Sequence, residues 1–439
     1  MSKKIAILGT GMAGFGAAHR LQGEDVEITL FDEKGHYGGH TASVNLPSGF
    51  TFDHGPHVSF TKDERIQRLL ADNVNNQYET IQYQVNNYWQ GHWITHPVQN
   101  NLHGLPVDLV TRIISEFAQN NCNESAAASS PANYQEWLIG SYGETFAKTF
   151  PMVYTEKYHT TAAANMTTDW IGPRMYRPSL EEVIRGALTK ATANVHYVTH
   201  FRYPSRGGFV SYLQRFTEGQ QLQLDHKLIG LQPKQRLLRF ANGANIGYDS
   251  VISSIPLPDF IPMIEGVPAD VLDAASKLAC TGCVLINIGV ARPGISAAHI
   301  SYFYDPDIVF TRLSFPHKMS PHNAPNNGSS IQAEVYFSNK YKPLREKPEQ
   351  LGQKVIADLI RCGLLDAGDQ ILCQETMILD YANVIFDHDR QASLQLIHGY
   401  LDDIGVAYCG RYGDWGYMWT DESFISGERA AEVALSTAK

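Results

Sequence analysis

The 439-residue chain contains little cysteine, no long hydrophobic run and no block of like charge. Its six cysteines are scattered, which favours a reducing compartment over a disulfide-stabilised secreted fold. No apolar stretch approaches the ~20 residues that cross a bilayer. The run 5–8, which follows Lys3 and Lys4, ends at Gly9 and is too short for a signal peptide. We therefore expect a soluble, cytoplasmic protein with no membrane span.

The distribution of charge and of metal-ligating residues excludes further classes of protein. Thirty-five basic and forty-five acidic residues give a net charge of −10 without long blocks, which argues against nucleic-acid binding and favours a small-molecule substrate. Cys280 and Cys283 form a CxxC that leads into the apolar run 284–290 and has no second CxxC. We interpret them as buried thiols at the start of a strand. None of the seventeen histidines stands in an HExxH pattern, so we expect no metal site.

The first forty residues have the pattern of a dinucleotide-binding βαβ unit. Hydrophobic periodicity predicts a strand over 5–8, a helix over 12–21 and a strand over 26–31. Residues 9–14 read GTGMAG, a GxGxxG turn that permits close approach of a pyrophosphate at the helix N-terminus. Asp32 ends the second strand, where a carboxylate would accept the ribose hydroxyls. The predicted cofactor contacts in this unit are Gly9, Gly11, Met12, Ala13, Gly14, Asp32 and Glu33.

A pair of glycines follows this unit at residues 38–43, GGHTAS. Backbone amides of such a pair can face a pyrophosphate and a ribityl chain. The segment resembles the GG motif of the flavoprotein group that contains amine oxidases, protoporphyrinogen oxidases and UDP-galactopyranose mutases. The resemblance implies FAD as the cofactor, with contacts from Gly38, Gly39, His40 and Thr41.

The resemblance recurs nearer the carboxyl end. Residues 222–231 and 248–258 resemble the segment in which this group passes a strand by the adenine, which implies a backbone contact from Leu228. Residues 410–415, GRYGDW, resemble the closing flavin motif, best matched by the mutases. The likeness implies that Arg411 is a cation near the pyrophosphate or flavin. It also implies that a helix from Ser423 points its N-terminus at the flavin and stabilises the reduced ring. The implied contacts are Leu228, Gly410, Arg411, Asp421, Glu422 and Ser423.

Two more stretches resemble the mutase branch. Residues 55–61, GPHVSFT, are similar to the mutases' GPHIFHT, which lies against the isoalloxazine, and 92–99 are similar to their YPYP region. Tyr417 falls on a mutase active-site tyrosine. The mutases' KQWG is here KYHT at 157–160, so their uridine-side tryptophan is absent, and Trp419 replaces an acid. The cofactor contacts implied by the first stretch are Gly55, Pro56 and His57.

Several arginines and aromatic residues are candidates for the substrate site. Arg174 and Arg177 would suit a phosphate or carboxylate, and would equally suit salt bridges at the surface. An aromatic set would suit a wall over a flavin and a ring-shaped substrate, or core packing: Tyr88, Trp89, Trp93, Trp415, Tyr417 and Trp419. The candidate catalytic residues are His57, Trp415 and Tyr417, and the candidate substrate contacts are Arg174, Arg177 and Tyr417.

These patterns predict an α/β fold in which a Rossmann-like FAD-binding domain receives an inserted α+β substrate domain. We expect residues 1–60, 200–265 and 400–439 in the first, and 61–199 and 266–399 in the second. Residues 105–188 should be mainly helical, with a surface loop at 120–131, and strands are expected at 284–290, 308–315 and 331–337. The flavin should lie at the domain boundary.

Three functions fit this sequence, and the first of them is the main hypothesis. The first is an FAD-dependent oxidoreductase in which a hydride passes from a small substrate, a sugar or an amine, to flavin N5. The second is a mutase-like enzyme in which reduced N5 attacks a sugar without net redox change. The third is a protein that holds FAD for structure or as an interaction module.

Overall fold

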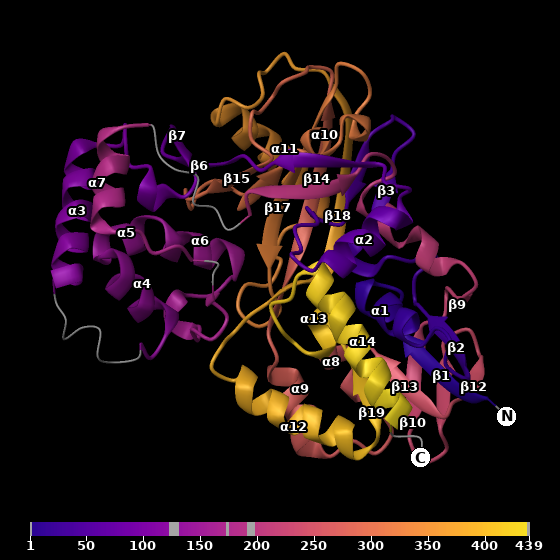
Figure 1. Cartoon of the computed structure of the whole chain (residues 1–439). Helices are drawn as coiled ribbons and strands as arrows, with labels where there is room; N and C mark the ends of the chain where they lie inside the picture. Colours follow the sequence, from indigo (N-terminus) through magenta and orange to yellow (C-terminus); the bar gives the residue numbers. More distant parts are fainter. Residues whose placement is uncertain (1, 123–130, 173–174, 191–197, 437–439) are drawn as a thin grey trace.

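The computed structural model describes residues 2–122, 131–172, 175–190 and 198–436. Figure 1 shows two β-sheets stacked along the molecule, with a group of helices to one side of the upper sheet. Both chain ends lie at the base of the lower sheet. In the described part of the chain, no helix has the length and hydrophobicity needed to cross a membrane.

The lower sheet is a five-stranded parallel sheet, as expected of a Rossmann-like domain. Its order is β19-β13-β1-β2-β9. The strands come from separated parts of the chain: β1 (Lys3–Leu8), β2 (Val26–Phe31), β9 (Gln221–Gln223), β13 (Ser250–Ser253) and β19 (Val406–Tyr408). This topology confirms the predicted α/β class.

Helices α1 (Met12–Arg20) and α14 (Thr420–Ser436) pack closely on this sheet. A Cβ atom at Gly16 would lie 2.1 Å from the carbonyl oxygen of Phe424, and one at Gly427 would lie 1.9 Å from that of Ala13. Glycine at both positions therefore lets the two backbones touch. This contact brings the carboxyl-terminal segment against the start of α1.

The upper sheet has seven strands in the order β18-β14-β17-β16-β15-β6-β7, and only the β15–β6 pair is parallel. Its strands are β6 (Val85–Trp89), β7 (His92–Thr95), β14 (Cys280–Val290), β15 (Ile300–Phe303), β16 (Arg312–Ser314), β17 (Ser329–Phe337) and β18 (Ile371–Val384). The strand predicted at 308–315 is wrong over its first half, because a turn that bonds Ile308 N to the Asp305 carbonyl precedes β16.

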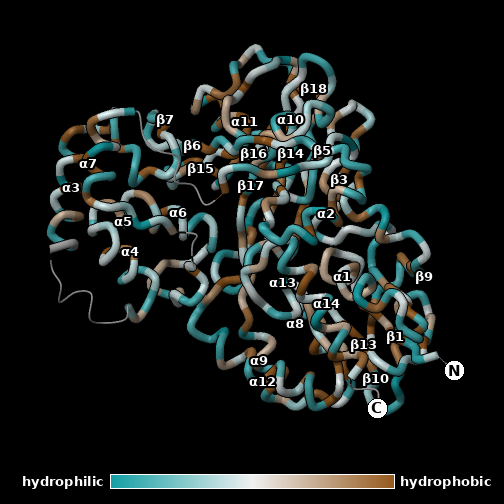
Figure 2. Tube along the Cα trace, in the orientation of Figure 1, coloured by the Kyte–Doolittle hydropathy of each residue, from teal (hydrophilic) through white to brown (hydrophobic). Residues whose placement is uncertain are grey.

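The two faces of β14 explain its unbroken hydrophobic sequence. Val284 and Ile286 pack in a core cluster with helix α11 (Pro348–Arg361), whereas Cys283 and Leu285 face a large cavity on the other side. Successive side chains of a strand point to opposite faces. Figure 2 shows hydrophobic colouring along the strands of both sheets. The two thiols of the CxxC are free, Cys283 buried and Cys280 partly so.

The helical group at the side comprises α3 (Val107–Cys122), α4 (Tyr134–Tyr142), α5 (Glu144–Thr149), α6 (Pro151–Tyr158) and α7 (Leu180–Leu188). The predicted surface loop at 120–131 begins later than expected, because α3 continues to Cys122. Residues 123–130 of that loop lie outside the described residues. A capping box between Ser179 and Glu182 starts α7, in line with the preference for Ser at a helix N-cap.

Small sheets and short helices connect these parts. The strands are β3 (Ser43–Asn45), β4 (Thr51–Asp53), β5 (Tyr78–Gln82), β8 (His200–Pro204), β10 (Leu228–Gln232), β11 (Leu237–Phe240) and β12 (Asn245–Gly247). The helices are α2 (Glu64–Asn73), α8 (Leu257–Phe260), α9 (Ala269–Lys277), α10 (Pro316–Met319), α12 (Arg390–Asp403) and α13 (Gly410–Gly413).

Candidate active site

A large cavity of about 1530 Å³ lies between the two sheets and the helical group. Its wall receives residues from the GxGxxG turn, from the inner face of the upper sheet and from α4, α5 and α6. Sites for one small ligand usually measure ~300–1,000 Å³. The cavity therefore has room for a dinucleotide and a second molecule.

The glycine turn between β1 and α1 forms one end of the cavity. Gly9 has φ +112°, and a Cβ there would lie 2.1 Å from Ser254 Oγ, so only glycine fits. A Cβ at Gly14 would lie 2.0 Å from the Gly9 carbonyl, which places Gly14 behind the turn rather than in the wall. Gly11, Met12 and Ala13 line the wall at the N-terminus of α1. This end of the cavity has the shape that a pyrophosphate requires.

The carboxylate of Asp32 is held at the end of β2. Its Oδ2 accepts hydrogen bonds from Thr10 N at 2.9 Å and Thr10 Oγ1 at 2.6 Å, and its Oδ1 accepts one from Lys34 N at 3.0 Å. Asp32 and Glu33 both line the cavity. The acid is therefore oriented beside the glycine turn, as a ribose contact would need.

The GG segment is bonded directly to the glycine turn. Gly38 N donates to the Thr10 carbonyl at 2.9 Å, and Thr41 Oγ1 donates to the Gly38 carbonyl at 2.8 Å. Gly38, Gly39, His40 and Thr41 line the cavity. The two glycine motifs thus form one continuous surface.

Two half-buried histidines of this region have lowered pKa values. Burial lowers the pKa of His40 to about 3 and that of His57 to about 4. His57 Nδ1 lies 3.0 Å from the Gly55 carbonyl, which can only accept, so Nδ1 carries the proton and Nε2 is the acceptor. Both rings line the cavity, together with Gly55 and Pro56.

The carboxyl-terminal loop closes the same part of the cavity. A Cβ at Gly410 would lie 2.7 Å from Ala13 Cβ, which shows how closely the loop approaches α1. Arg411 is half-buried and lines the wall. Its guanidinium donates to the Met418 carbonyl at 2.8 and 3.2 Å and to that of Ala382 at 3.0 Å. Arg411 therefore braces its own loop as well as placing a cation at the cavity.

The remaining predicted site residues divide into two groups. Leu228, Tyr417, Trp419 and Ser423 line the cavity, although α14 begins at Thr420 rather than at Ser423. Eight others are outside the wall: Gly14, Tyr88, Trp89, Trp93, Trp415, Asp421, Glu422 and Arg177. A ninth, Arg174, lies outside the described residues.

Trp415 and Arg177 differ most from their predicted roles. Trp415 is fully buried between Tyr381 and Tyr412, which corresponds to the core packing that the sequence left open. Arg177 is exposed, as expected of a surface arginine. Glu422 accepts a hydrogen bond from Trp419 N at 2.7 Å and caps the start of α14. None of the three is placed to touch a ligand in the cavity.

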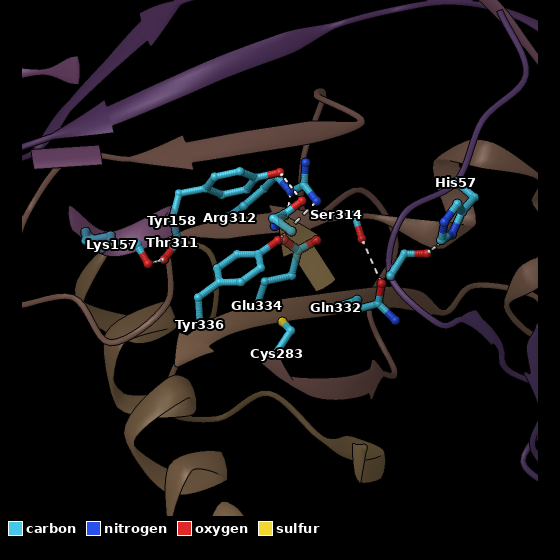
Figure 3. A network of polar contacts seen from close by, with 12 residues as sticks. His57, Lys157, Tyr158, Cys283, Thr311, Arg312, Ser314, Gln332, Glu334 and Tyr336 are labelled. Atoms are coloured by element: carbon cyan, nitrogen blue, oxygen red, sulfur yellow. Dashed lines mark hydrogen bonds and ion pairs between the residues drawn. The ribbon is translucent and has the colours of Figure 1, made fainter. Parts of the chain in front are cut away.

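An ion pair that the sequence reasoning missed lies in the cavity wall. Arg312 Nε donates to Glu334 Oε2 at 2.8 Å, and the Glu334 side chain is 1% exposed. Tyr336 Oη donates to the same carboxylate oxygen. Figure 3 shows the pair between the rings of Tyr158 and Tyr336. The available signal was a charge within each of two apolar strand sequences, 308–315 and 331–337.

Aromatic rings surround this ion pair and form what we call the tyrosine chamber. Its members in the cavity wall are Tyr134, Tyr154, Tyr158, Tyr302, Tyr304, Tyr336, Trp170 and Tyr417. Burial raises the pKa of Tyr154, Tyr158 and Tyr336 well above the usual value, so their hydroxyls stay protonated. The chamber thus offers hydroxyl groups and ring faces to a ligand.

His159 lies in the chamber wall at the place where the mutases carry a tryptophan. Its ring makes edge contacts with Tyr158 at 4.9 Å and Trp170 at 5.3 Å, and burial lowers its pKa to about 3. The residue is therefore a neutral polar ring.

In the described part of the chain, no cluster of three His, Cys, Asp or Glu side chains could hold a metal ion.

Comparisons with known proteins agree with this geometry. Residues 7–72 match the family model of an NAD(P)-binding Rossmann-like domain. Protoporphyrinogen oxidase 2 of Arabidopsis thaliana is 21% identical, over 99% of this chain and 94% of its own length. The solved structure of reduced UDP-galactopyranose mutase matches with a TM-score of 0.92 at 25% identity, covering 100% of this chain and 95% of that one.

A second solved structure, a putative protoporphyrinogen oxidase from Exiguobacterium sp. 255-15, matches with a TM-score of 0.76 at 17% identity and covers 99% of both chains. The matches to the oxidases and to the mutase each span almost the whole chain. This chain therefore carries an NAD(P)-binding Rossmann-like domain and shares its overall fold with flavoenzymes that include protoporphyrinogen oxidases and UDP-galactopyranose mutase.

Proposed function

We propose that this protein is an FAD-dependent enzyme that isomerises a sugar substrate without net oxidation. The residues that would hold FAD are the two glycine motifs, the Asp32 carboxylate and the loop from Gly410, because they form one connected surface around a cavity of sufficient size. Bound FAD would supply N5 as the reacting atom. The residues of this chain bind and orient the substrate against it.

The observation that carries the proposed reaction is the close match to the mutase over the complete chain, with a TM-score of 0.92 against 0.76 for the oxidase. The tyrosine chamber supports it. Protonated hydroxyls and ring faces suit a sugar, whose hydroxyls accept hydrogen bonds and whose C–H faces pack on aromatic rings. Arg312 lies at the chamber in an ion pair with Glu334, so the pair adds no net charge.

An oxidoreductase is the second candidate, and the geometry of His57 favours it. With Nδ1–H directed at the Gly55 carbonyl, Nε2 of this neutral histidine is an acceptor in the cavity wall. It can take the proton that leaves a substrate when a hydride is removed. The relative named protoporphyrinogen oxidase, similar over nearly the full chain, supports the same reading.

Anaerobic flavin spectroscopy separates these functions. The purified protein should carry FAD, identified after release by chromatography. Under our proposal, the dithionite-reduced enzyme converts a nucleotide sugar, tested first with UDP-galactopyranose, to its isomer over many turnovers without consuming reductant. The oxidised enzyme should stay yellow when the same nucleotide sugars are added. Bleaching of oxidised flavin by a nucleotide sugar or an amine would instead establish the oxidoreductase, and a protein that binds no FAD would refute both.

A further inference from the structure

Helix α12 (Arg390–Asp403) holds the turn that carries Tyr417 into the cavity wall. Arg390 donates twice to the Trp415 carbonyl, from Nε at 2.9 Å and from Nη2. His398, about two turns further along the helix, has Nε2 3.0 Å from the Gly413 carbonyl, so this nitrogen carries the proton. Two side chains of one helix therefore hold two carbonyls of one turn.

The turn contains a strained residue. Trp415 has φ +49°, a left-handed conformation that is unfavourable for a bulky residue. Its ring is fully buried between Tyr381 and Tyr412, while its carbonyl is bonded to Arg390. Packing of the side chain and hydrogen bonding of the main chain together keep this conformation. The Arg390 bonds are the part that a substitution can remove without opening a hole in the core.

The same turn sets the place of Tyr417. Gly416 N donates to the Arg411 carbonyl at 3.0 Å, and the Arg411 guanidinium donates to the Met418 carbonyl. Arg411 Cζ lies 5.1 Å from the centre of the Tyr417 ring. The residues on both sides of Tyr417 are thus tied to the Arg411 loop, which leaves its ring little freedom.

Arg390 also contacts the segment that carries Trp170. Its Nη1 lies 3.6 Å from Asp169 Oδ2, and Trp170, next in the chain, stacks on the Tyr417 ring at 6.1 Å with an interplanar angle of 27°. Arg390 Cζ lies 4.0 Å from the centre of the Phe386 ring, and the Arg390 side chain is 11% exposed. One buried cation therefore joins the segments that carry both stacked rings.

We propose that Arg390, supported by His398, is a positioning residue that keeps Tyr417 and Trp170 together as one wall of the cavity. Neither Arg390 nor His398 lines the cavity, so they act through the turn rather than on a ligand. The inference rests only on the FAD-binding part of the proposed function and is independent of the reaction. It predicts that the surroundings of bound FAD change when these donors are removed.

Two pairs of variants and a surface control test this role. Arg390→Met removes the donors at similar length, and Arg390→Lys keeps the charge with fewer donors. His398→Leu removes the second donor, and His398→Gln keeps an N–H at a similar distance. Arg185→Met is the control, because Arg185 is an exposed arginine on α7 that pairs with Glu181. The readouts are the FAD dissociation constant, from flavin fluorescence, and the visible circular dichroism of the bound flavin.

We expect Arg390→Met to raise the FAD dissociation constant about tenfold and to reduce the flavin dichroism. Arg390→Lys and His398→Leu should show smaller changes, and His398→Gln and Arg185→Met should match the wild type. In a Tyr417→Ala background, Arg390→Met should add less than twofold, because residues that act as a unit are not additive. A full tenfold effect in that background would overturn the inference.

Other outcomes are equally decisive. If Arg390→Met does not fold, Arg390→Lys and His398→Leu decide the question, and wild-type values for both would overturn the inference. A lower unfolding temperature with an unchanged FAD constant and dichroism would show a merely structural role. A wild-type protein that binds no FAD would refute the proposed function instead.

Discussion

Breaking the buried ion pair between Arg312 and Glu334 should destabilise the upper sheet strongly. The two residues face each other in the register of β16 and β17, and Glu334 is 1% exposed. Its Oε1 has no hydrogen-bond partner among the described residues, so the carboxylate depends on Arg312 and Tyr336 at Oε2. Removing one partner of a buried pair typically costs about 3–5 kcal/mol, because the other charge is left uncompensated.

We therefore expect Arg312→Met to lower the free energy of unfolding by about 3–5 kcal/mol. The double variant Arg312→Met/Glu334→Leu should recover most of this loss, since replacing both charges with apolar groups is often close to neutral. Arg361→Met, at an exposed pair with Asp307, is the matched control and should change the free energy by less than about 1 kcal/mol.

Urea unfolding of the apo-protein, followed by far-ultraviolet and near-ultraviolet circular dichroism, measures these differences in the transition that includes the upper sheet. Coupling in the double-mutant cycle should be several kcal/mol. Additive losses, with the double variant less stable than either single one, would refute the reasoning, because they would mean that each side chain contributes by packing and not through the pair.

Three further predictions concern the glycine turn and the buried titratable groups. Gly14→Ala should abolish FAD binding and destabilise the apo-protein, because the new Cβ would lie 2.0 Å from the Gly9 carbonyl oxygen. Gly140→Ala is the control and should be neutral or stabilising, because this helical position has open space around it. Flavin fluorescence and urea unfolding test both variants. His40 and His57 have folded pKa values of about 3 and 4, below the unfolded value of 6.5, so the stability that these neutral rings contribute is present above pH 6.5 and is lost as pH falls toward 4. The urea midpoint should therefore be lower at pH 5 than at pH 7, and this difference should be smaller in His57→Gln. Burial raises the pKa of Asp53 to about 6, so the stability that this carboxyl group contributes is present below pH 3.8 and is lost as pH rises through 6. Compared with the wild type, Asp53→Asn should therefore be more stable at pH 8 than at pH 5. An unchanged dependence of stability on pH would contradict this.

The local motifs of this protein were readable from the sequence. The glycine turn, Asp32 and the GG pair lie within a short stretch of chain, and their function depends on backbone geometry that neighbouring residues dictate. The structure places all of them except Gly14 in one cavity wall, and Gly14 directly behind it. A short-range motif can be interpreted without knowing which distant segments pack around it.

The tertiary structure alone decided which side chains meet across long distances. The pairing of Arg312 with Glu334 depends on the register of two strands, and a charge in a short strand reads from sequence as a solvent-facing residue. Trp415 and Tyr417 are two residues apart, yet one is core and the other lines the cavity, because Arg390 holds the turn between them. Burial and register are properties of the assembled fold, since they depend on contacts between residues far apart in the chain.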